Sequence, residues 1–200
     1  MATDILKTLG LTRRELTELV RQNPSLRGFI SGYTGEYKLR KFFLSDKRIS
    51  NIRKYDDHDR SKKSDLVFVY KKADVSIEVK SLQTKTIRRE GNIFFGKVQC
   101  DASDKRPIKL PNGTVVSTTC LLAGEFDLLA ANLYGFENKW NFIFAKNSDL
   151  PRTNSKKYTP AQRKHLIATS IDVSWPPKPP FVVDPFPLLD EIVKTKQAKK

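Results

Sequence analysis

Two short segments of the chain have the hydrophobic composition of β-strands, with a polar segment between them. Residues 65–70 and 75–80 are rich in β-branched and aromatic side chains, and the residues between them are polar. The pattern predicts a β-hairpin with its turn centred on residues 72 and 73. The other segments with strand-like patterns are residues 93–95, 114–116 (after a Pro-Asn-Gly turn at 111–113), 126–133 and 140–145.

Helix signals precede and follow these segments. Residues 12–15 match a capping box, and Pro24 stands at a favoured first helical position. Thr34 can cap a third helix in the same region. Two further helices are expected over residues 161–168 and 186–196. Strands and helices in one chain predict a fold of the α/β class.

The predicted hairpin determines which side chains share a face of the sheet. With the turn at residues 72 and 73, Leu66 pairs with Val79, Phe68 with Ile77 and Tyr70 with Val75, and these three pairs form one apolar face. Alternation then places Asp65, Glu78 and Lys80 on the other face. In this register Asp65 lies opposite Lys80.

The net charge is unusually positive for a globular chain. There are 37 Lys and Arg against 22 Asp and Glu, which gives +15 at pH 7. Residues 36–109 carry 20 basic and 11 acidic side chains, and residues 151–182 carry six and one. The intervening residues 110–150 carry two basic and four acidic side chains. Two basic blocks around a mildly acidic stretch favour a polyanion as partner, although a solvated surface would have the same composition.

Other functional classes are disfavoured by composition. The two cysteines cannot form a disulfide framework or a four-cysteine zinc site. The sequence has no run of 18 apolar residues, and its first residues mix charges of both signs, unlike a signal peptide. We therefore expect a cytoplasmic protein with no membrane segment.

Asp65, Glu78 and Lys80 fit two different roles. They can form a salt bridge on a solvated face. They also fit metal-dependent phosphodiester cleavage, because two carboxylates bind a hard divalent cation through oxygen. In that case the lysine positions or deprotonates a water molecule and stabilises developing negative charge.

The same residues resemble the PD-(D/E)xK nuclease superfamily, the fold of many restriction endonucleases. The resemblance implies an α/β fold with a restriction-endonuclease-like core, in which helices flank a central mixed β-sheet. The match consists of Asp65, twelve intervening residues, and then Glu78-Val79-Lys80, although Ser64 stands where the family often has proline. The resemblance covers about residues 33–151. The family also places a helix between the D/E-x-K strand and the next core strand. Residues 82–124 contain no clear amphipathic helix, the best candidate being the β-branched segment 116–124, so we expect an insertion there.

Two further residues acquire roles through this resemblance. Glu36 points along the apolar face of its predicted helix, and the family often carries a supporting glutamate on its first core helix. That glutamate can equally be a helix-start residue favoured by the helix dipole. Gln83 lies three residues after Lys80, where related nucleases sometimes have a polar residue that contacts the water or phosphate.

The resemblance implies a Mg²⁺-dependent endonuclease that cuts double-stranded DNA, most simply a type II restriction enzyme of prokaryotic cytoplasm. Asp65 and Glu78 would hold the metal, Lys80 would act on the water, and Glu36 and Gln83 would assist. A homodimer is the simplest way to cut both strands, although a monomer that nicks each strand in turn is the alternative. No organic cofactor is expected. The alternatives are a structure-selective repair or junction-resolving nuclease, and a nucleic-acid-binding protein without catalysis.

The resemblance implies three segments: an N-terminal helical segment over residues 1–32, the nuclease core over 33–151 with an insertion at about 82–124, and residues 152–200. The last segment would hold a basic helix, a proline-rich stretch and a C-terminal helix packed on the core. DNA contacts are expected from the basic side chains of the insertion and of the last segment, most of them to phosphates. These are Lys85, Arg88, Arg89, Lys97, Lys105, Arg106, Lys109, Lys156 and Lys157.

Overall fold

The computed structural model describes residues 4–55 and 64–198 and divides the chain into two compact units, residues 1–34 and 35–200. Its helices are α1 (Ile5–Leu9), α2 (Arg13–Gln22), α3 (Pro24–Leu44), α4 (Tyr134–Glu137), α5 (Pro160–Arg163) and α6 (Phe186–Gln197), with 3₁₀ turns η1 (Thr84–Thr86) and η2 (Asn147–Asp149). Its strands are β1 (Ile49–Arg53), β2 (Leu66–Tyr70), β3 (Ala73–Ser81), β4 (Arg88–Glu90), β5 (Ile93–Gln99), β6 (Asp101–Lys109), β7 (Val115–Cys120), β8 (Leu128–Asn132), β9 (Phe142–Lys146) and β10 (Ser170–Trp175).

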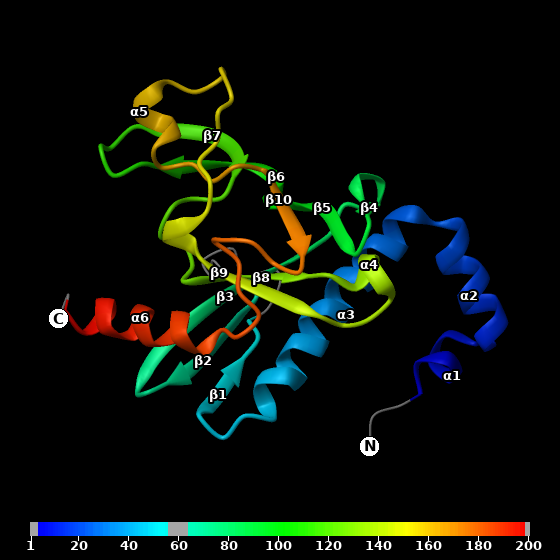
Figure 1. Ribbon diagram of the computed structural model, residues 1–200. Helices are drawn as coiled ribbons and strands as arrows, with labels where there is room; N and C mark the ends of the chain where they lie inside the picture. The colour runs from blue at the N-terminus through cyan, green and yellow to red at the C-terminus, as the bar shows by residue number, and fades with distance from the viewer. Residues whose placement is uncertain (1–3, 56–63, 199–200) are drawn as a thin grey trace. The chain divides into compact units, whose positions relative to one another are not determined.

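The predicted α/β class is confirmed by a mixed central sheet with the strand order β1-β2-β3-β8-β9 (Figure 1). Strands β3 and β8 are parallel, and every other neighbouring pair in this sheet is antiparallel. One face of the sheet packs against α3 and α6 through a core that includes Leu39, Phe43 and Leu189. The opposite face packs against β5 and β10 through a second core that includes Val98 and Val173.

The segment between β3 and β8, where an insertion was expected, is built from strands. β4, β5 and β10 form a three-stranded antiparallel sheet, and β6 pairs with β7 in a separate hairpin. Residues 116–124, the best helical candidate from the sequence, mostly belong to β7, in keeping with their β-branched side chains. The predicted turn at residues 111–113 does connect β6 to β7.

The helix predictions near the N-terminus are partly correct. The capping box is confirmed, since Thr12 Oγ1 accepts the Glu15 N–H and Glu15 accepts the Thr12 N–H. The third helix predicted to start at Thr34 is wrong, because α3 runs without interruption from Pro24 to Leu44. Thr34 is not a cap there: its hydroxyl donates to the Ile30 carbonyl within the helix, as Thr commonly does in helix interiors.

The helix predicted over residues 161–168 is much shorter than expected. α5 ends at Arg163, and the following apolar pair enters β-bridges instead. Leu166 pairs with Leu122, and Ile167 pairs with Arg152, so both apolar side chains reach the core. Tertiary burial of these two residues outweighs the local helical signal. No described helix has the length and apolar character needed to cross a membrane.

Candidate active site

The hairpin β2–β3 brings the predicted catalytic residues to one face, but its register differs from the prediction. Leu66 pairs with Ile77, where Val79 was expected. The turn consists of Lys71 and Lys72 alone, with φ of 46° and 65°. Tight hairpin turns with two positive φ values usually carry Asn or Gly, so Lys-Lys gives no warning of this turn in the sequence. Because the register shifts by two residues, the side chains keep their predicted faces.

Glu78 and Lys80 form the centre of the site on β3. Val75, Ile77 and Val79 point into the core beneath α3 and α6, so Glu78 and Lys80 point to the opposite face of the sheet. The Lys80 ammonium nitrogen lies 2.8 Å from Glu78 Oε1. Their side chains are only 20% and 10% exposed, so this is not a solvated surface pair.

Asp65 is anchored beside these two residues by the backbone. Its Oδ2 accepts the Val79 N–H over 2.7 Å. Since Leu66 pairs with Ile77, continuing the antiparallel register places Asp65 across from Glu78 and not across from Lys80 as predicted. The two carboxylates are therefore neighbours on adjacent strands.

The electrostatics of the site follow from burial and from this pair of carboxylates. Burial, together with the Asp65 charge, raises the pKa of Glu78 to about 7, although Lys80 opposes the shift. Burial would lower the pKa of Lys80, but the charges of Glu78 and Asp65 outweigh burial and raise that pKa above its ordinary value. Lys80 is thus a protonated cation at neutral pH, whereas Glu78 is poised between its two protonation states.

The donor set fits a hard divalent cation. No group of three or more Asp, Glu, His or Cys side chains within residues 4–55 and 64–198 is arranged to hold a metal ion. Asp65 and Glu78 supply two carboxylates, and Mg²⁺ is commonly bound through one or two carboxylates with water and substrate phosphates as the other ligands. A cation there would also relieve the repulsion that raises the pKa of Glu78.

Glu36 lies on α3, the helix that packs beneath the sheet. Its Oε2 lies 2.6 Å from the ammonium nitrogen of Lys54, which directly follows β1. The preceding residue, Gly35, is buried, and a side chain there would come within 3.0 Å of Asn132 Nδ2 at the end of β8. Glycine thus lets α3 approach the carboxyl end of the parallel strands β3 and β8. A direct role for Glu36 in the site stays a prediction.

Gln83 is oriented toward β5 by the contacts the structure gives it. Its N–H donates to the Lys97 carbonyl over 2.8 Å, and its side-chain Nε2 lies 3.4 Å from Gln99 Oε1. These bonds fix the start of η1 against β5. These hydrogen bonds do not test the predicted contact of Gln83 with water or phosphate, which stays a prediction.

Sequence reasoning did not place two further groups near the site. Glu125 contributes to the raised pKa of Glu78, and the Cys100 thiol interacts electrostatically with both Lys80 and Glu78. Burial raises the pKa of the Cys100 thiol to about 12, so that thiol stays protonated at neutral pH. Both residues lie near the site because segments that are distant in the sequence pack together, and no local sequence pattern predicts such packing.

Arg106, predicted as a DNA contact, pairs with Glu125. Its two terminal nitrogens each lie 2.7 Å from one Glu125 carboxylate oxygen, a bidentate geometry. The Glu125 side chain is only 7% exposed and also accepts the Leu122 N–H. In this structure the pair joins β6 to the segment before β8, so a structural role competes with DNA contact at Arg106.

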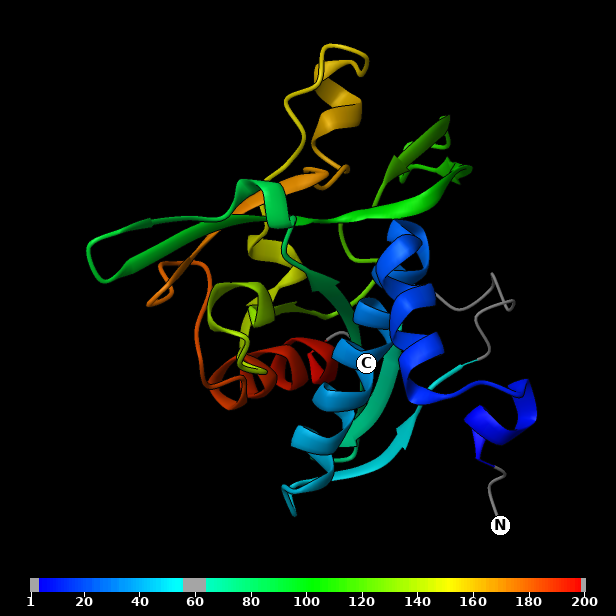
Figure 2. The same ribbon diagram turned by 90° about the vertical axis from the view of Figure 1, so that its right-hand side faces the viewer.

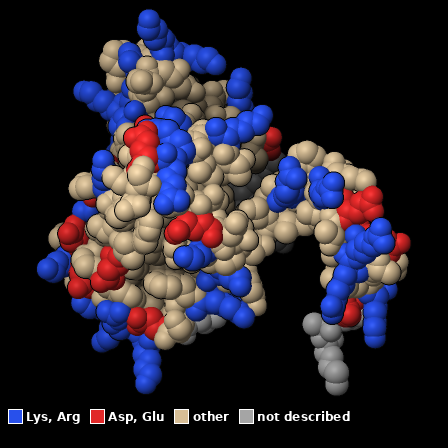
Figure 3. All heavy atoms as spheres, turned by 45° about the vertical axis from the view of Figure 1, so that its right-hand side comes forward, with Lys and Arg blue, Asp and Glu red and all other residues tan. Residues whose placement is uncertain are grey.

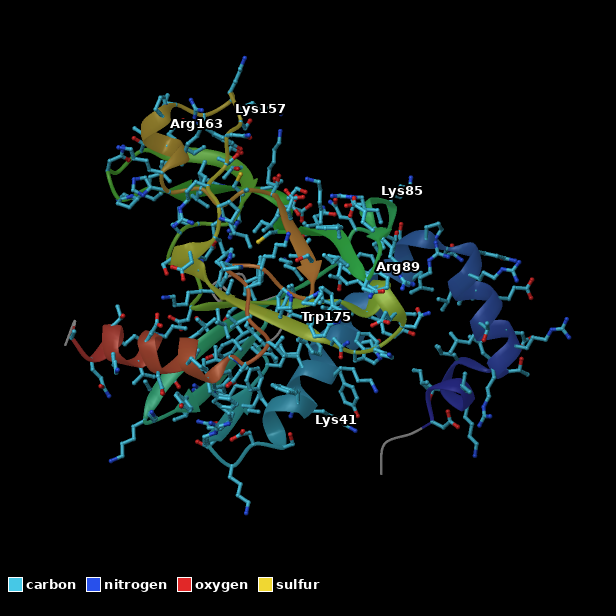
Figure 4. All side chains as sticks on the ribbon, in the orientation of Figure 1. Lys41, Lys85, Arg89, Lys157, Arg163 and Trp175 are labelled. Carbon is cyan, nitrogen blue, oxygen red and sulfur yellow. The ribbon has the colours of Figure 1, made fainter. Side chains whose placement is uncertain are left out.

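The other predicted DNA-binding residues fall into two groups (Figure 4). Lys85, Arg88, Arg89 and Lys97 lie on η1 and the hairpin β4–β5, while Lys105, Lys109, Lys156 and Lys157 lie on β6 and before α5. The segment before α5 is attached to β7, the partner strand of β6, because the Tyr158 and Thr118 hydroxyl oxygens lie 2.6 Å apart, in hydrogen-bonding contact. Figure 3 shows Lys and Arg spread over much of the visible face, including the end that carries α5.

Two arginine side chains of β4 lie over aromatic rings of the paired strand β5. The Arg88 guanidinium lies 4.6 Å from the Phe95 ring centroid, and that of Arg89 lies 5.2 Å from the Phe94 centroid. Arg88 also pairs with Glu90, and all three charged residues are exposed. The exposed guanidinium groups are therefore held in place without being buried.

Comparisons with known proteins give little further information. No model of a known protein family matches the sequence, and no curated protein matches it. Among solved structures, the chain is similar to the bacterial homing endonuclease I-Ssp6803I, with 15% identity and a TM-score of 0.38 over 68% of this chain and 86% of that chain. So low an identity and TM-score show nothing about the function of this chain.

Proposed function

We propose that this protein is a metal-dependent endonuclease that hydrolyses phosphodiester bonds in double-stranded DNA. The observation that carries the proposal is the half-enclosed group of Asp65, Glu78 and Lys80 at the end of the hairpin β2–β3. Two neighbouring carboxylates with a raised pKa at Glu78 favour a bound cation, and the +15 net charge favours a polyanionic substrate.

Each residue has a defined task in this proposal. Asp65 and Glu78 would hold Mg²⁺, which when bound polarises the scissile phosphate and lowers the pKa of a coordinated water. The Val79 N–H keeps Asp65 oriented toward Glu78. Lys80, because its pKa is raised, donates hydrogen bonds and positive charge to the attacked phosphate and to the water. Its alternative role as a base would require it first to lose that proton.

The finer assignment is a type II restriction enzyme acting as a homodimer, with Glu36 supporting the site from α3 and Gln83 near the water. One active site per chain must act twice to cut a duplex, and a two-fold dimer supplies two sites at once. The ion pair with Lys54 holds the Glu36 carboxylate of α3 beside the end of β1.

Plasmid digestion in Mg²⁺, followed by run-off sequencing of the ends, tests this assignment. Discrete fragments with ends at one sequence would support a restriction enzyme. Cutting that follows branched or damaged DNA would support a structure-selective nuclease. Binding with steep salt dependence and no cutting in Mg²⁺ or Mn²⁺ would contradict the proposal and leave a binding protein in which Glu78 and Lys80 are a structural pair.

A further inference from the structure

One long extended segment crosses the candidate active site. Strands β5 and β6 follow each other with only Cys100 between them, so residues 93–109 form a nearly continuous ribbon. Cys100 lies within electrostatic reach of Lys80 and Glu78. The ribbon is tied to the end of β3 by the bridge between Leu82 and Val98. The middle of the ribbon therefore lies at the catalytic residues.

The ribbon carries a hairpin at each end, and Figure 2 shows the two hairpins extending to opposite sides of its middle. Away from Cys100, β5 leads to the β4–β5 turn at Gly91 and Asn92, and β6 leads to the β6–β7 turn at Asn112. At about 3.3 Å per residue, the eight steps from residue 100 to residue 92 span roughly 26 Å. The ten steps from residue 100 to residue 110 span at most about 33 Å, less the irregularity in the pairing of β6.

Both arms carry groups that suit a nucleic acid. The β4–β5 arm presents Arg88 and Arg89 on exposed positions, each guanidinium lying over an aromatic ring. The β6–β7 arm presents the exposed Lys105 and Lys109, and the Tyr158–Thr118 hydrogen bond holds the basic residues before α5 against it. Two-stranded β-ribbons fit the major groove of DNA, and basic side chains on them contact phosphates.

We propose that the DNA duplex lies along residues 93–109, so that the two hairpins contact it on opposite sides of the phosphodiester to be cut. This inference rests on the proposed nuclease function. Since base pairs repeat every 3.4 Å, the turn of the β4–β5 arm would reach about eight base pairs from the cut. The turn of the β6–β7 arm would reach up to about ten base pairs on the other side.

Single-site affinity cleavage tests this arrangement. Both native cysteines are buried, Cys100 at 0% and Cys120 at 2% exposure, so an iron chelate can be attached to one introduced cysteine at a time. Asn92→Cys and Asn112→Cys place the chelate on the two turns, both exposed. Lys194→Cys is the matched control, since it is exposed on α6, which covers the other face of the sheet. Each change is made in an Asp65→Asn background that binds DNA without cutting it.

The DNA is a duplex whose cut position is known from wild-type digestion. We expect hydroxyl radicals from Asn92→Cys to cleave about eight base pairs to one side of the cut, and those from Asn112→Cys to cleave up to about ten base pairs to the other side. Lys194→Cys should produce no localised cleavage. In a homodimer each pattern would repeat about the two-fold axis. If a label at a turn weakens binding, Glu90→Cys or Thr114→Cys carries it beside the turn.

Two results would overturn the proposed path of the DNA and leave the nuclease function standing. In the first, labels on both turns cleave on the same side of the cut. In the second, neither label cleaves although the DNA stays bound. Conversely, absence of wild-type cutting in Mg²⁺ would refute the function. In that case two separate cleavage zones on either side of the footprint centre would still support the two-armed surface, and a single shared zone would refute it.

Discussion

Glu78→Gln separates the proposed chemistry from simple structural stabilisation, because it removes the buried charge and keeps the shape of the side chain. The pKa of Glu78 lies at about 7 in the folded protein, against an ordinary value of 4.5. A carboxyl whose pKa is raised by folding stays protonated in the native state while the unfolded chain ionises. The folded state is therefore penalised as pH rises from 4.5 toward 7, and the penalty is complete above that range.

The size of this penalty on the folded state follows from the difference between the folded and ordinary pKa values of Glu78. At about 1.4 kcal/mol per pKa unit, the rise from 4.5 to about 7 corresponds to about 3 kcal/mol. Glutamine does not titrate, so the free energy of unfolding of Glu78→Gln, relative to wild type, should increase by that order between pH 4.5 and pH 8. The attraction between Lys80 and ionised Glu78 is already contained in this shift, because Lys80 opposes the rise in the pKa of Glu78. Other effects of the substitution do not titrate, so the comparison is of the trend with pH.

Urea denaturation of both proteins at a series of pH values, without divalent metal, measures the trend. Lys194→Gln is a control for general charge effects, since Lys194 is exposed on α6. Mg²⁺ added at pH 8 should stabilise the wild type and leave Glu78→Gln unchanged. A stability difference that stays constant from pH 4.5 to pH 8 would show that the pKa of Glu78 is not raised, and it would refute the electrostatic argument for a cation site.

Three further outcomes follow from the same geometry. Asp65→Ala should abolish Mg²⁺-dependent cleavage. In the absence of metal it should bind DNA as tightly as the wild type or more tightly, because a negative charge that faces the phosphates is lost. A gel-shift titration with a parallel cleavage assay checks both outcomes, and full cleavage by the variant would contradict the assignment of Asp65 to the site. Lys80→Ala should cut at least tenfold more slowly but still bind Mn²⁺ in calorimetry, because the lysine acts on phosphate and water; loss of metal binding would contradict that role. Replacing Arg88 and Arg89 together by serine should reduce the slope of log K against log salt by about 0.9 for each lost phosphate contact, and an unchanged slope at low salt would mark both as solvated charges.

The sequence was sufficient to predict what depends on local periodicity. The faces of β2 and β3 follow from alternation, which is why Asp65, Glu78 and Lys80 share a face as predicted even though the register is shifted. The register itself depends on the Lys71–Lys72 turn, whose positive φ values are atypical for lysine. The sequence predicts two helices where the structure has the single helix α3, because Thr34 is a residue type that can cap a helix. The structure explains Gly35 by its contact with Asn132.

Features of the fold that depend on contacts between distant parts of the chain could not be predicted from the sequence. β10 was not predicted, although Ile171 and Val173 alternate with polar residues, because its pairing partner β5 lies far away in the chain. β6 is mostly polar and exposed, so its strand identity comes from pairing with β7 and not from its own pattern. The neighbours of Glu78 contributed by Cys100 and Glu125 are likewise products of packing.

The most direct test of the central claim is the rate at which purified wild type and Glu78→Gln, prepared identically, convert supercoiled plasmid to nicked and linear forms. With Mg²⁺ the wild type should cut, EDTA should stop it, and Glu78→Gln should cut at least a hundredfold more slowly while it binds the same DNA with similar affinity. Equal rates for the two proteins, or cutting by the wild type that persists in EDTA, would contradict a metal-dependent site formed by Asp65, Glu78 and Lys80.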